Sequence, residues 1–413
     1  MQYLSRQVLR ILGIFMVVVL LYQPAQATTT QRQTADNVYL AYVHEGIVTL
    51  ADQTGLPIIE VGPSFEPGQS ASIFWDPTGD KLFIARRDGL WQSNAQGAQA
   101  VQLPGTYGLT LTLDRRGQVL YYLESNSPQE NNANTLSFPL REANLANLST
   151  APGRFISYVG AFGTGSAATL TGAAMQYARG GGLLGPSRPR LFATFGETLF
   201  YSCCFPAAGL NAINIRTGET WQYAGLETLI PGASATNRDY SRLAGPTTDG
   251  HIVVVDLITG GTRRYVLDLG TIERVAWSPD NTTLYLAVRR PSQDPLQLNA
   301  PITTEIDTRS AQIAIWRLNL ITGGSTQLTV LGDFYGVPSM AATEDYVFVV
   351  VTERNARLVA DLNAGRLPAD ISTDDPRLIA EYLPGSILYR ITSDGSEAFS
   401  IMADVWGVRA RPR

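Results

Sequence analysis

A short hairpin pattern recurs along this chain of 413 residues and restricts its fold more than any other feature. Each copy has an alternating apolar strand, a polar turn that usually ends in Gly, and a second alternating strand. The clearest copies lie at 210–221, 251–260 and 313–323, and weaker ones lie around Gly55, Gly97 and Gly395 and, without Gly, at 135–149. Gly55 and Gly97 are 42 residues apart. The same spacing of 42 separates Gly218 from Gly260, so the pattern is an internal repeat.

A second hairpin precedes several of these copies, and its best examples lie at 73–85, 111–123 and 275–287. In two of them Pro stands early in the turn, where its fixed φ fits, and Gly or Asn follows where a positive φ is needed. Two hairpins per 42 residues give a four-stranded antiparallel unit, which is the size of a propeller blade. The sequence therefore predicts an all-β fold, a β-propeller of seven such blades. Six blades is the alternative, because 151–190 is difficult to assign.

The two ends of the repeat region predict that the ring is closed by both chain ends. The first unit has only three strands, which are expected at 37–43, 47–52 and 57–61. The last strand, at 405–410, follows a complete fourth strand and aligns with the first strand of the preceding unit, at 335–340. We therefore expect the C-terminal strand to become the innermost strand of the N-terminal blade, which removes an exposed sheet edge.

Residues 1–27 have the pattern of a secretory signal peptide. Arg6 and Arg10 are followed by the apolar run 11–22 and by Ala25-Gln26-Ala27, which resembles a cleavage site. Twelve helical residues rise only about 18 Å, less than the ~30 Å hydrocarbon core of a bilayer. An uncleaved membrane anchor is therefore the less favoured alternative. The sequence predicts an exported protein, either periplasmic or at the cell surface, whose only membrane contact would be this segment if it stayed uncleaved.

The rest of the chain is predicted to be a single domain. Residues 28–36 are a linker, and 37–413 form one propeller with loop insertions near 151–190, 289–312 and 353–385. The formal net charge of −5 excludes the basic surplus that a nucleic-acid partner requires.

The residue inventory gives no positive sign of catalysis. Lys81 is the only lysine, and His44 and His251 are the only histidines, so neither a Walker loop nor a multi-histidine metal site is found. No G-x-S-x-G motif occurs. We predict no catalytic, cofactor-binding or metal-binding residues and no cofactor, and an enzyme is the less favoured reading.

Two turn sequences resemble a known family motif. Trp277-Ser-Pro-Asp-Asn281, and more loosely Trp75-Asp-Pro-Thr-Gly79, are similar to the W-S-P-D-G motif of TolB-type, WD-repeat-like β-propellers. Asn281 replaces the Gly of that motif, and Asn tolerates the same left-handed backbone. The resemblance extends over 37–410 as an architecture, but only two or three blades carry the motif. It implies a bacterial exported propeller that acts through protein contacts and does not identify the partner.

A second resemblance supports an alternative function. The segment 212–221 is similar to the A-x-D-x-x-T-G-x-x-x-W repeat of pyrroloquinoline-quinone propellers, with Asn214 in place of Asp. Some of those enzymes carry a disulfide between adjacent cysteines, which invites comparison with Cys203 and Cys204. This resemblance implies a quinone- or metal-dependent enzyme for a small extracellular substrate. The residues themselves allow either a strained vicinal disulfide or two buried thiols at Cys203 and Cys204.

Long loops predict where a partner binds. The connections between second and third strands of a blade open on one face, and the extensions at 125–134, 289–312 and 353–385 belong to such connections. The last is expected to contain helices at 355–363 and 374–382. Insertions confined to one face usually mark the binding face. The residues that we expect on this face are Arg86, Arg87, Arg289, Arg290, Arg354, His44, Cys203 and Cys204.

These observations together predict a non-catalytic, exported propeller that serves as a protein-binding or scaffold module in the cell envelope. Its partner is an envelope protein that the sequence does not identify, and the sequence gives no oligomeric state.

Overall fold

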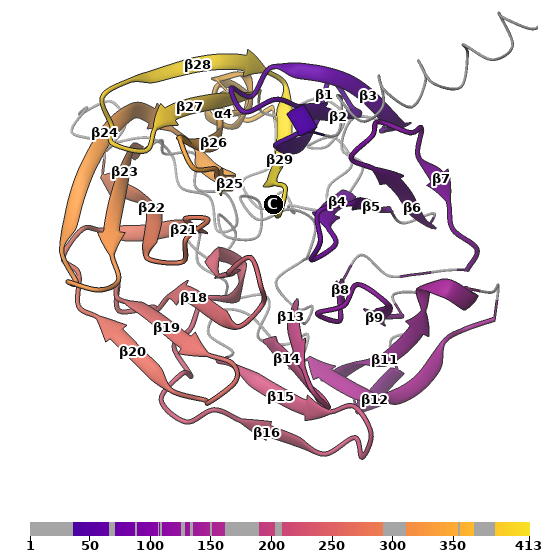
Figure 1. Ribbon diagram of the computed structural model, residues 1–413. Helices are drawn as coiled ribbons and strands as arrows, with labels where there is room; N and C mark the ends of the chain where they lie inside the picture. Colours follow the sequence, from indigo (N-terminus) through magenta and orange to yellow (C-terminus); the bar gives the residue numbers. More distant parts are fainter. Residues whose placement is uncertain are drawn as a thin grey trace, which may run out of the picture.

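The fold is a closed ring of antiparallel sheets (Figure 1). The structure, a computed structural model, describes residues 36–65, 71–86, 89–105, 107, 110–124, 129–132, 135–148, 151–161, 190–202, 209–291, 311–353, 356–366 and 385–413. These residues form seven sheets, six with four strands and one with five. This confirms the predicted seven-bladed β-propeller and rules out the six-bladed alternative.

Each blade lists its strands from the ring axis outward. Blade 1 contains β29 (Val405–Ala410), β1 (Leu40–His44), β2 (Ile47–Ala51) and β3 (Pro57–Ser64). Blade 2 contains β4 (Ala71–Trp75), β5 (Lys81–Arg86), β6 (Gly89–Asn94) and β7 (Val101–Gln102). Blade 3 contains β8 (Leu111–Leu113), β9 (Val119–Leu123), β11 (Thr135–Asn144) and β12 (Arg154–Ala161), and β10 (Gln129–Asn132) extends it by pairing with β11.

The remaining blades follow the same order. Blade 4 contains β13 (Arg190–Phe195), β14 (Thr198–Ser202), β15 (Asn211–Asn214) and β16 (Thr220–Gln222). Blade 5 contains β17 (Ala235–Thr236), β18 (Arg242–Pro246), β19 (Ile252–Asp256) and β20 (Thr262–Tyr265). Blade 6 contains β21 (Thr271–Trp277), β22 (Thr283–Pro291), β23 (Ala311–Asn319) and β24 (Ser325–Phe334). Blade 7 contains β25 (Gly336–Ala342), β26 (Tyr346–Thr352), β27 (Ser386–Thr392) and β28 (Ala398–Ala403).

Helices are short in the described residues. They are the α-helix α4 (Ala356–Asn363) and the 3-10 helices η1 (Leu145–Asn147) and η3 (Pro231–Ala233). The predicted helix at 355–363 is confirmed by α4, and the one predicted at 374–382 lies outside the described residues. No helix in the described part of the chain is long and apolar enough to cross a membrane. Residues 1–27, the predicted signal, and 28–35 of the predicted linker are not among the described residues.

The two chain ends close the ring as predicted. The strand β29 pairs antiparallel with β1, with Leu40 opposite Ala410 and His44 opposite Val405. The C-terminus lies at the centre of the ring in Figure 1. The chain beyond β29 crosses the first turn of blade 2, where Arg411 Nε donates to the carbonyl oxygen of Gly79 at 2.6 Å.

The turn residues of the repeat have the conformations that the sequence demands. Asn281 has a φ of 60°, and Gly79, at the equivalent turn position, has a φ of 75°. A side chain at Gly79 would also be excluded by contact, because its Cβ would lie 2.0 Å from the carbonyl oxygen of Pro412. Asn therefore replaces Gly in blade 6, where the left-handed backbone is the only requirement, while blade 2 needs Gly.

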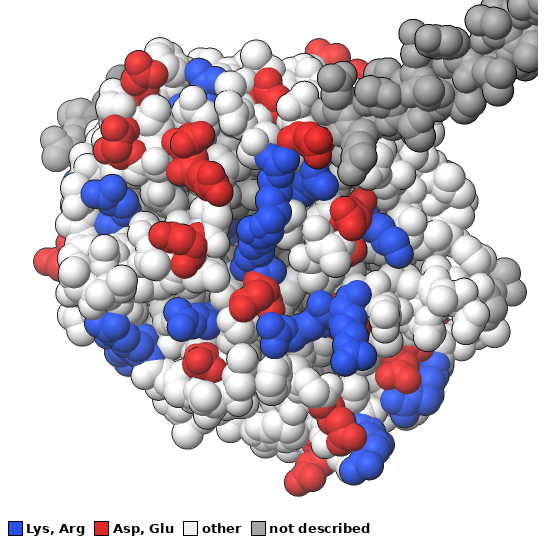
Figure 2. Space-filling model, viewed as in Figure 1, with Lys and Arg blue, Asp and Glu red and all other residues white. Residues whose placement is uncertain are grey.

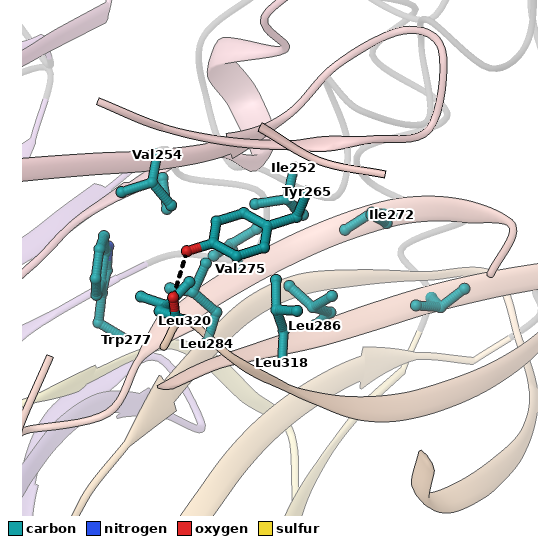
Figure 3. Packing of buried hydrophobic residues seen from close by; sticks show 12 residues of the cluster. Ile252, Val254, Tyr265, Ile272, Val275, Trp277, Leu284, Leu286, Leu318 and Leu320 are labelled. Carbon is teal, nitrogen blue, oxygen red and sulfur yellow. Dashed lines mark hydrogen bonds between the residues drawn. The ribbon is translucent and has the colours of Figure 1, made fainter. Parts of the chain in front are cut away.

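Apolar side chains of adjacent blades pack against each other around the ring. Figure 3 shows the contact between blades 5 and 6, where Val254 and Tyr265 face Val275, Leu284 and Leu286. The Tyr265 hydroxyl donates to the carbonyl oxygen of Leu320 at 2.7 Å, so its polar end is satisfied inside the interface. Sheets that pack face to face in this way need few charged residues, which agrees with the charged content of 16%.

Blade 3 differs from the sequence expectation. The hairpin expected at 135–149 is instead the single strand β11 followed by η1, and its partner strand β12 begins only at Arg154. Asn144 caps η1 by accepting the Ala146 N–H at 2.8 Å, which delays the return of the chain. The strand β12 thus occupies the start of the predicted insertion 151–190, and 162–189 lie outside the described residues.

Ring closure leads to a first prediction. A chain that ends at Asp404 should lose its cooperative unfolding transition, because β1 and the adjacent blades lose the strand that completes them. A synthetic peptide of residues 405–413 added in trans should restore the transition, measured by tryptophan fluorescence during heating. A matched peptide with Val405→Asp and Val408→Asp should not, since both side chains are fully buried. A truncated chain that unfolds like the full protein would contradict this role of β29.

Candidate functional site

The connections between second and third strands all open on one face of the ring, which we call the loop face. The three long ones join β9 to β11, β22 to β23 and β26 to β27. Because strands alternate in direction, the connections between successive blades open on this face too. The link from β12 to β13, which spans 162–189, is therefore also on it. The opposite face carries only the tight turns between first and second and between third and fourth strands, apart from 145–153.

Arg86 ends β5 at the loop face and is held in place by its surroundings. Its Nη1 donates to the carbonyl oxygen of Ser64 at 2.8 Å. The guanidinium lies 5.2 Å from the ring centre of Phe65 and 6.0 Å from that of Trp91, within range of a cation–π interaction. The side chain is half-buried, so part of the guanidinium still reaches solvent.

Arg290 occupies the matching place in blade 6. Its Nε donates to the carbonyl oxygen of Leu269 at 3.3 Å, and its guanidinium lies 5.2 Å from the ring centre of Trp316. In both blades a Trp of the third strand supports an Arg of the second strand. The predicted equivalence of the two strand ends is therefore confirmed for Arg86 and Arg290.

Arg289 has a different role, because it is an internal clamp between blades 6 and 7. Its Nη1 lies 3.0 Å from Glu273 Oε1 and donates to the carbonyl oxygen of Tyr335 at 2.7 Å. The Val337 N–H donates to the other Glu273 carboxylate oxygen at 2.9 Å. The side chains of Arg289 and Glu273 are only 13% and 8% exposed, so this pair holds the two blades together and offers little surface to a partner.

The other predicted residues are placed only in part. His44 ends β1 on the loop face and is half-buried, next to Glu45, which has a left-handed φ of 47°. Arg87, Arg354, Cys203 and Cys204 lie outside the described residues, so their contribution and the state of the two cysteines stay predictions. The roles of His44, Arg86 and Arg290 in binding also stay predictions.

His251 lies on the loop face of blade 5. Its Nε2 is 4.0 Å from Asp249 Oδ2, and the same carboxylate forms an ion pair with Arg264. The hydrogen bond from the Thr247 hydroxyl, and then Arg264 and His251, lower the pKa of Asp249. No group of three or more His, Cys, Asp and Glu that could hold a metal ion occurs in the described residues.

The resemblance to quinone-binding propellers has a simpler explanation in the turn itself. The Asn214 side-chain oxygen accepts the N–H groups of Arg216 and Thr217, both at 2.9 Å, and Gly218 has a φ of 75°. Asn319 does the same in blade 6, with two bonds of 2.9 Å. Trp221 is 39% exposed on an outer strand and is not docked in the core. The motif thus builds a hairpin turn.

The structure also brings together three arginines that the sequence analysis did not single out. Arg190 opens β13, Arg274 lies in β21, and Arg409 lies in β29, all innermost strands of their blades. Each stands within a strand that otherwise reads as mostly apolar. That local contrast is the signal that could have identified them, but their meeting depends on which strands line the axis.

Comparisons with known proteins add little beyond the architecture. No protein-family model matches the chain, and no curated protein matches it. Among solved structures, a putative TolB from Agrobacterium tumefaciens is similar at 12% identity and a TM-score of 0.36, covering 91% of this chain and 99% of that one. TolB from Acinetobacter baumannii has 12% identity and a TM-score of 0.41, covering 89% and 79%. A functionally unknown protein from Desulfotomaculum acetoxidans has 9% identity and a TM-score of 0.48, covering 90% and 98%.

TolB propellers are thus among the structural neighbours of this chain, in agreement with the resemblance of the turn motifs. The fold itself rests on the seven observed blades and not on these distant matches.

The clamp between blades 6 and 7 yields a second prediction. Glu273→Ala should lower the free energy of unfolding by about 3–5 kcal/mol, because it leaves a buried guanidinium without its counter-charge. Arg264→Ala, which breaks the exposed pair with Asp249, should cost less than about 1 kcal/mol. Both are measured by urea denaturation. A loss for Glu273→Ala no larger than that for Arg264→Ala would show that the clamp is not structural.

Proposed function

We propose that this protein is an exported, non-catalytic β-propeller that binds a protein partner of the cell envelope through its loop face. The observation that carries the proposal is the one-sided placement of its long connections. Those of blades 3, 6 and 7, together with the link 162–189, all open on the loop face. Since loops on a rigid scaffold commonly carry recognition, this face is the best candidate for the contact.

The arginines of the loop face suit a protein interface. Arg86 and Arg290 each lie over a Trp and donate to a backbone carbonyl, so less side-chain entropy is lost when a partner binds. Arg and aromatic residues are enriched among the residues that dominate binding energy. Their separation across blades 2 and 6 favours a partner broad enough to span the ring and not a small substrate.

The partner contact gives a third prediction. The double substitution Arg86→Ala with Arg290→Ala should weaken capture of the partner from an envelope extract by about tenfold or more. The control is Arg116→Ala with Arg216→Ala, which removes the same charge from exposed turns on the opposite face. Binding is compared by crosslinking the purified variants in the extract and quantifying the shared product by mass spectrometry. Equal loss in both double variants, or none in either, would contradict a specific role of the loop face.

Export gives a fourth prediction, which concerns residues 1–27. The intact mass of the protein isolated from its native cells should correspond to a chain that begins at Thr28. Replacing Ala25 and Ala27 by Leu should block this processing, because signal peptidase requires small residues there, and should leave the chain in the membrane fraction. A full-length mass for the unaltered protein would instead favour an uncleaved anchor.

An enzyme remains distinguishable by direct assay. An absorbance scan and metal analysis of the purified protein test the quinone- or metal-dependent alternative, since a bound quinone or a stoichiometric metal would overturn the proposed non-catalytic role.

A further inference from the structure

Three arginines from separate blades converge on the axis of the ring. Arg190 enters from blade 4, Arg274 from blade 6 and Arg409 from blade 1. Arg274 is 6% exposed, whereas Arg190 and Arg409 are half-buried although they lie deep in the molecule. Exposed area that persists on side chains so far from the outer surface means that they line the axial passage.

The helix η3 holds two of these guanidiniums side by side. Arg190 Nη1 donates to the carbonyl oxygens of Pro231 and Gly232, the latter at 3.1 Å. Arg274 Nη1 donates to the same Gly232 oxygen at 2.6 Å, and its Nε donates to the carbonyl oxygen of Pro338 at 3.1 Å. Two like charges that share one carbonyl oxygen are necessarily close together.

Charge on the axis is not balanced within the described residues. Neither Arg190 nor Arg409 forms an ion pair with any Asp or Glu described by the structure, and their hydrogen bonds go to backbone carbonyls. The segment 162–189, which leads directly into Arg190, contains no Asp or Glu. Burial, followed by repulsion from Arg274 and Arg409, lowers the pKa of Arg190 to about 9. Arg289, by contrast, has its counter-charge in Glu273.

Donor groups on the axis are still available. A guanidinium carries five N–H groups, and the hydrogen bonds of Arg190 all leave from Nη1. Arg409 donates only to the carbonyl oxygen of its neighbour Val408, at 2.9 Å. The Tyr240 phenol acts on Arg409 electrostatically, and Tyr240 has a left-handed φ of 58°. A bulky residue in that conformation is unusual and is found where the surroundings fix it.

The mouth of the axis on the opposite face is also basic. Figure 2 shows Lys and Arg side chains gathered over the centre of the ring, although the protein has a net charge of −5. Arg411 and Arg413 follow β29 here, with Arg413 stacked 3.9 Å from the ring centre of Tyr39. A positive centre on an acidic protein concentrates anions at the axis.

We propose that the axial arginines Arg190, Arg274 and Arg409 form a binding site for a phosphate group, either free phosphate or a phosphomonoester. Arginine matches the planar, bidentate geometry of phosphate oxygens. A phosphomonoester carries about −1.5 to −2 charges near neutral pH, which balances three guanidiniums better than the single charge of a carboxylate. The site is separate from the loop-face contact, and its test needs no partner protein.

The experiment is a titration of the purified full protein with inorganic phosphate, with sodium chloride added to keep the ionic strength constant. Calorimetry should show saturable binding, and the melting temperature should rise with phosphate concentration. Arg409→Gln and Arg190→Gln should each weaken phosphate binding at least about tenfold, as expected for loss of a charge-assisted hydrogen bond. Arg216→Gln, an exposed turn residue, is the matched control and should bind like the unaltered protein.

Arg409→Gln carries the decisive reading, because Arg409 has little structural role beyond its bond to Val408. Without phosphate it should melt at a higher temperature than the unaltered protein, since one uncompensated positive charge has been removed. With phosphate the order should reverse. If Arg190→Gln fails to fold for want of its bonds to η3, Arg409→Gln decides alone.

Two further ligands define the chemistry. Acetate should bind far more weakly than phosphate, and phenyl phosphate distinguishes the sources, since its binding indicates a phosphomonoester and its failure a free ion. The proposal is overturned if phosphate stabilises no more than chloride at equal ionic strength, if acetate binds equally well, or if Arg409→Gln retains full phosphate affinity.

Discussion

The pairing of β29 with β1 is the interaction on which the rest of the ring depends. It joins Leu40 to Ala410 across almost the whole chain, and it completes a blade that is packed on both sides. Val405 and Val408 of β29 pack with Phe348 and Leu388 of blade 7. On its other side, blade 1 packs against Ile73 and Trp75 of blade 2. Without β29 two inter-blade contacts are incomplete, so closure determines the stability of neighbours that it does not itself belong to.

The hairpin turns explain why the two faces of the ring differ. Where the third and fourth strands meet, an Asn or Asp side chain accepts the next free N–H groups and a Gly turns back with positive φ, as at Asp256 and Gly260. A turn in which each residue has a conformational requirement has little room for an inserted segment. Connections on the loop face carry no such common requirement. Insertions therefore accumulate there, and the repeat itself favours one face for recognition.

Local features made most of the fold predictable, and non-local ones did not. The alternating strands and Gly turns gave the blades, and the strand missing from the first unit gave the closure. The boundary of blade 3 was missed because its outer hairpin has no Gly and is delayed by the Asn144 cap of η1. Arg289 was expected at the surface because its partner Glu273, on the preceding strand, carries no sequence mark of the pairing. The axial arginines were missed for the same reason.

The axial arginines conflict with the rule that otherwise organises this protein, in which inner strands are apolar or bear small polar groups. Ser339, for example, accepts the Val408 N–H at 3.0 Å and so joins two inner strands without any charge. A hydroxyl or an apolar side chain at 190, 274 and 409 would satisfy the packing equally well and would avoid repulsion between like charges. Local choices that oppose stability are concentrated at functional sites. Because only a closed ring brings blades 1, 4 and 6 to one axis, the charge cluster exists in the folded protein alone, and an anion that neutralises it would stabilise the closed ring selectively.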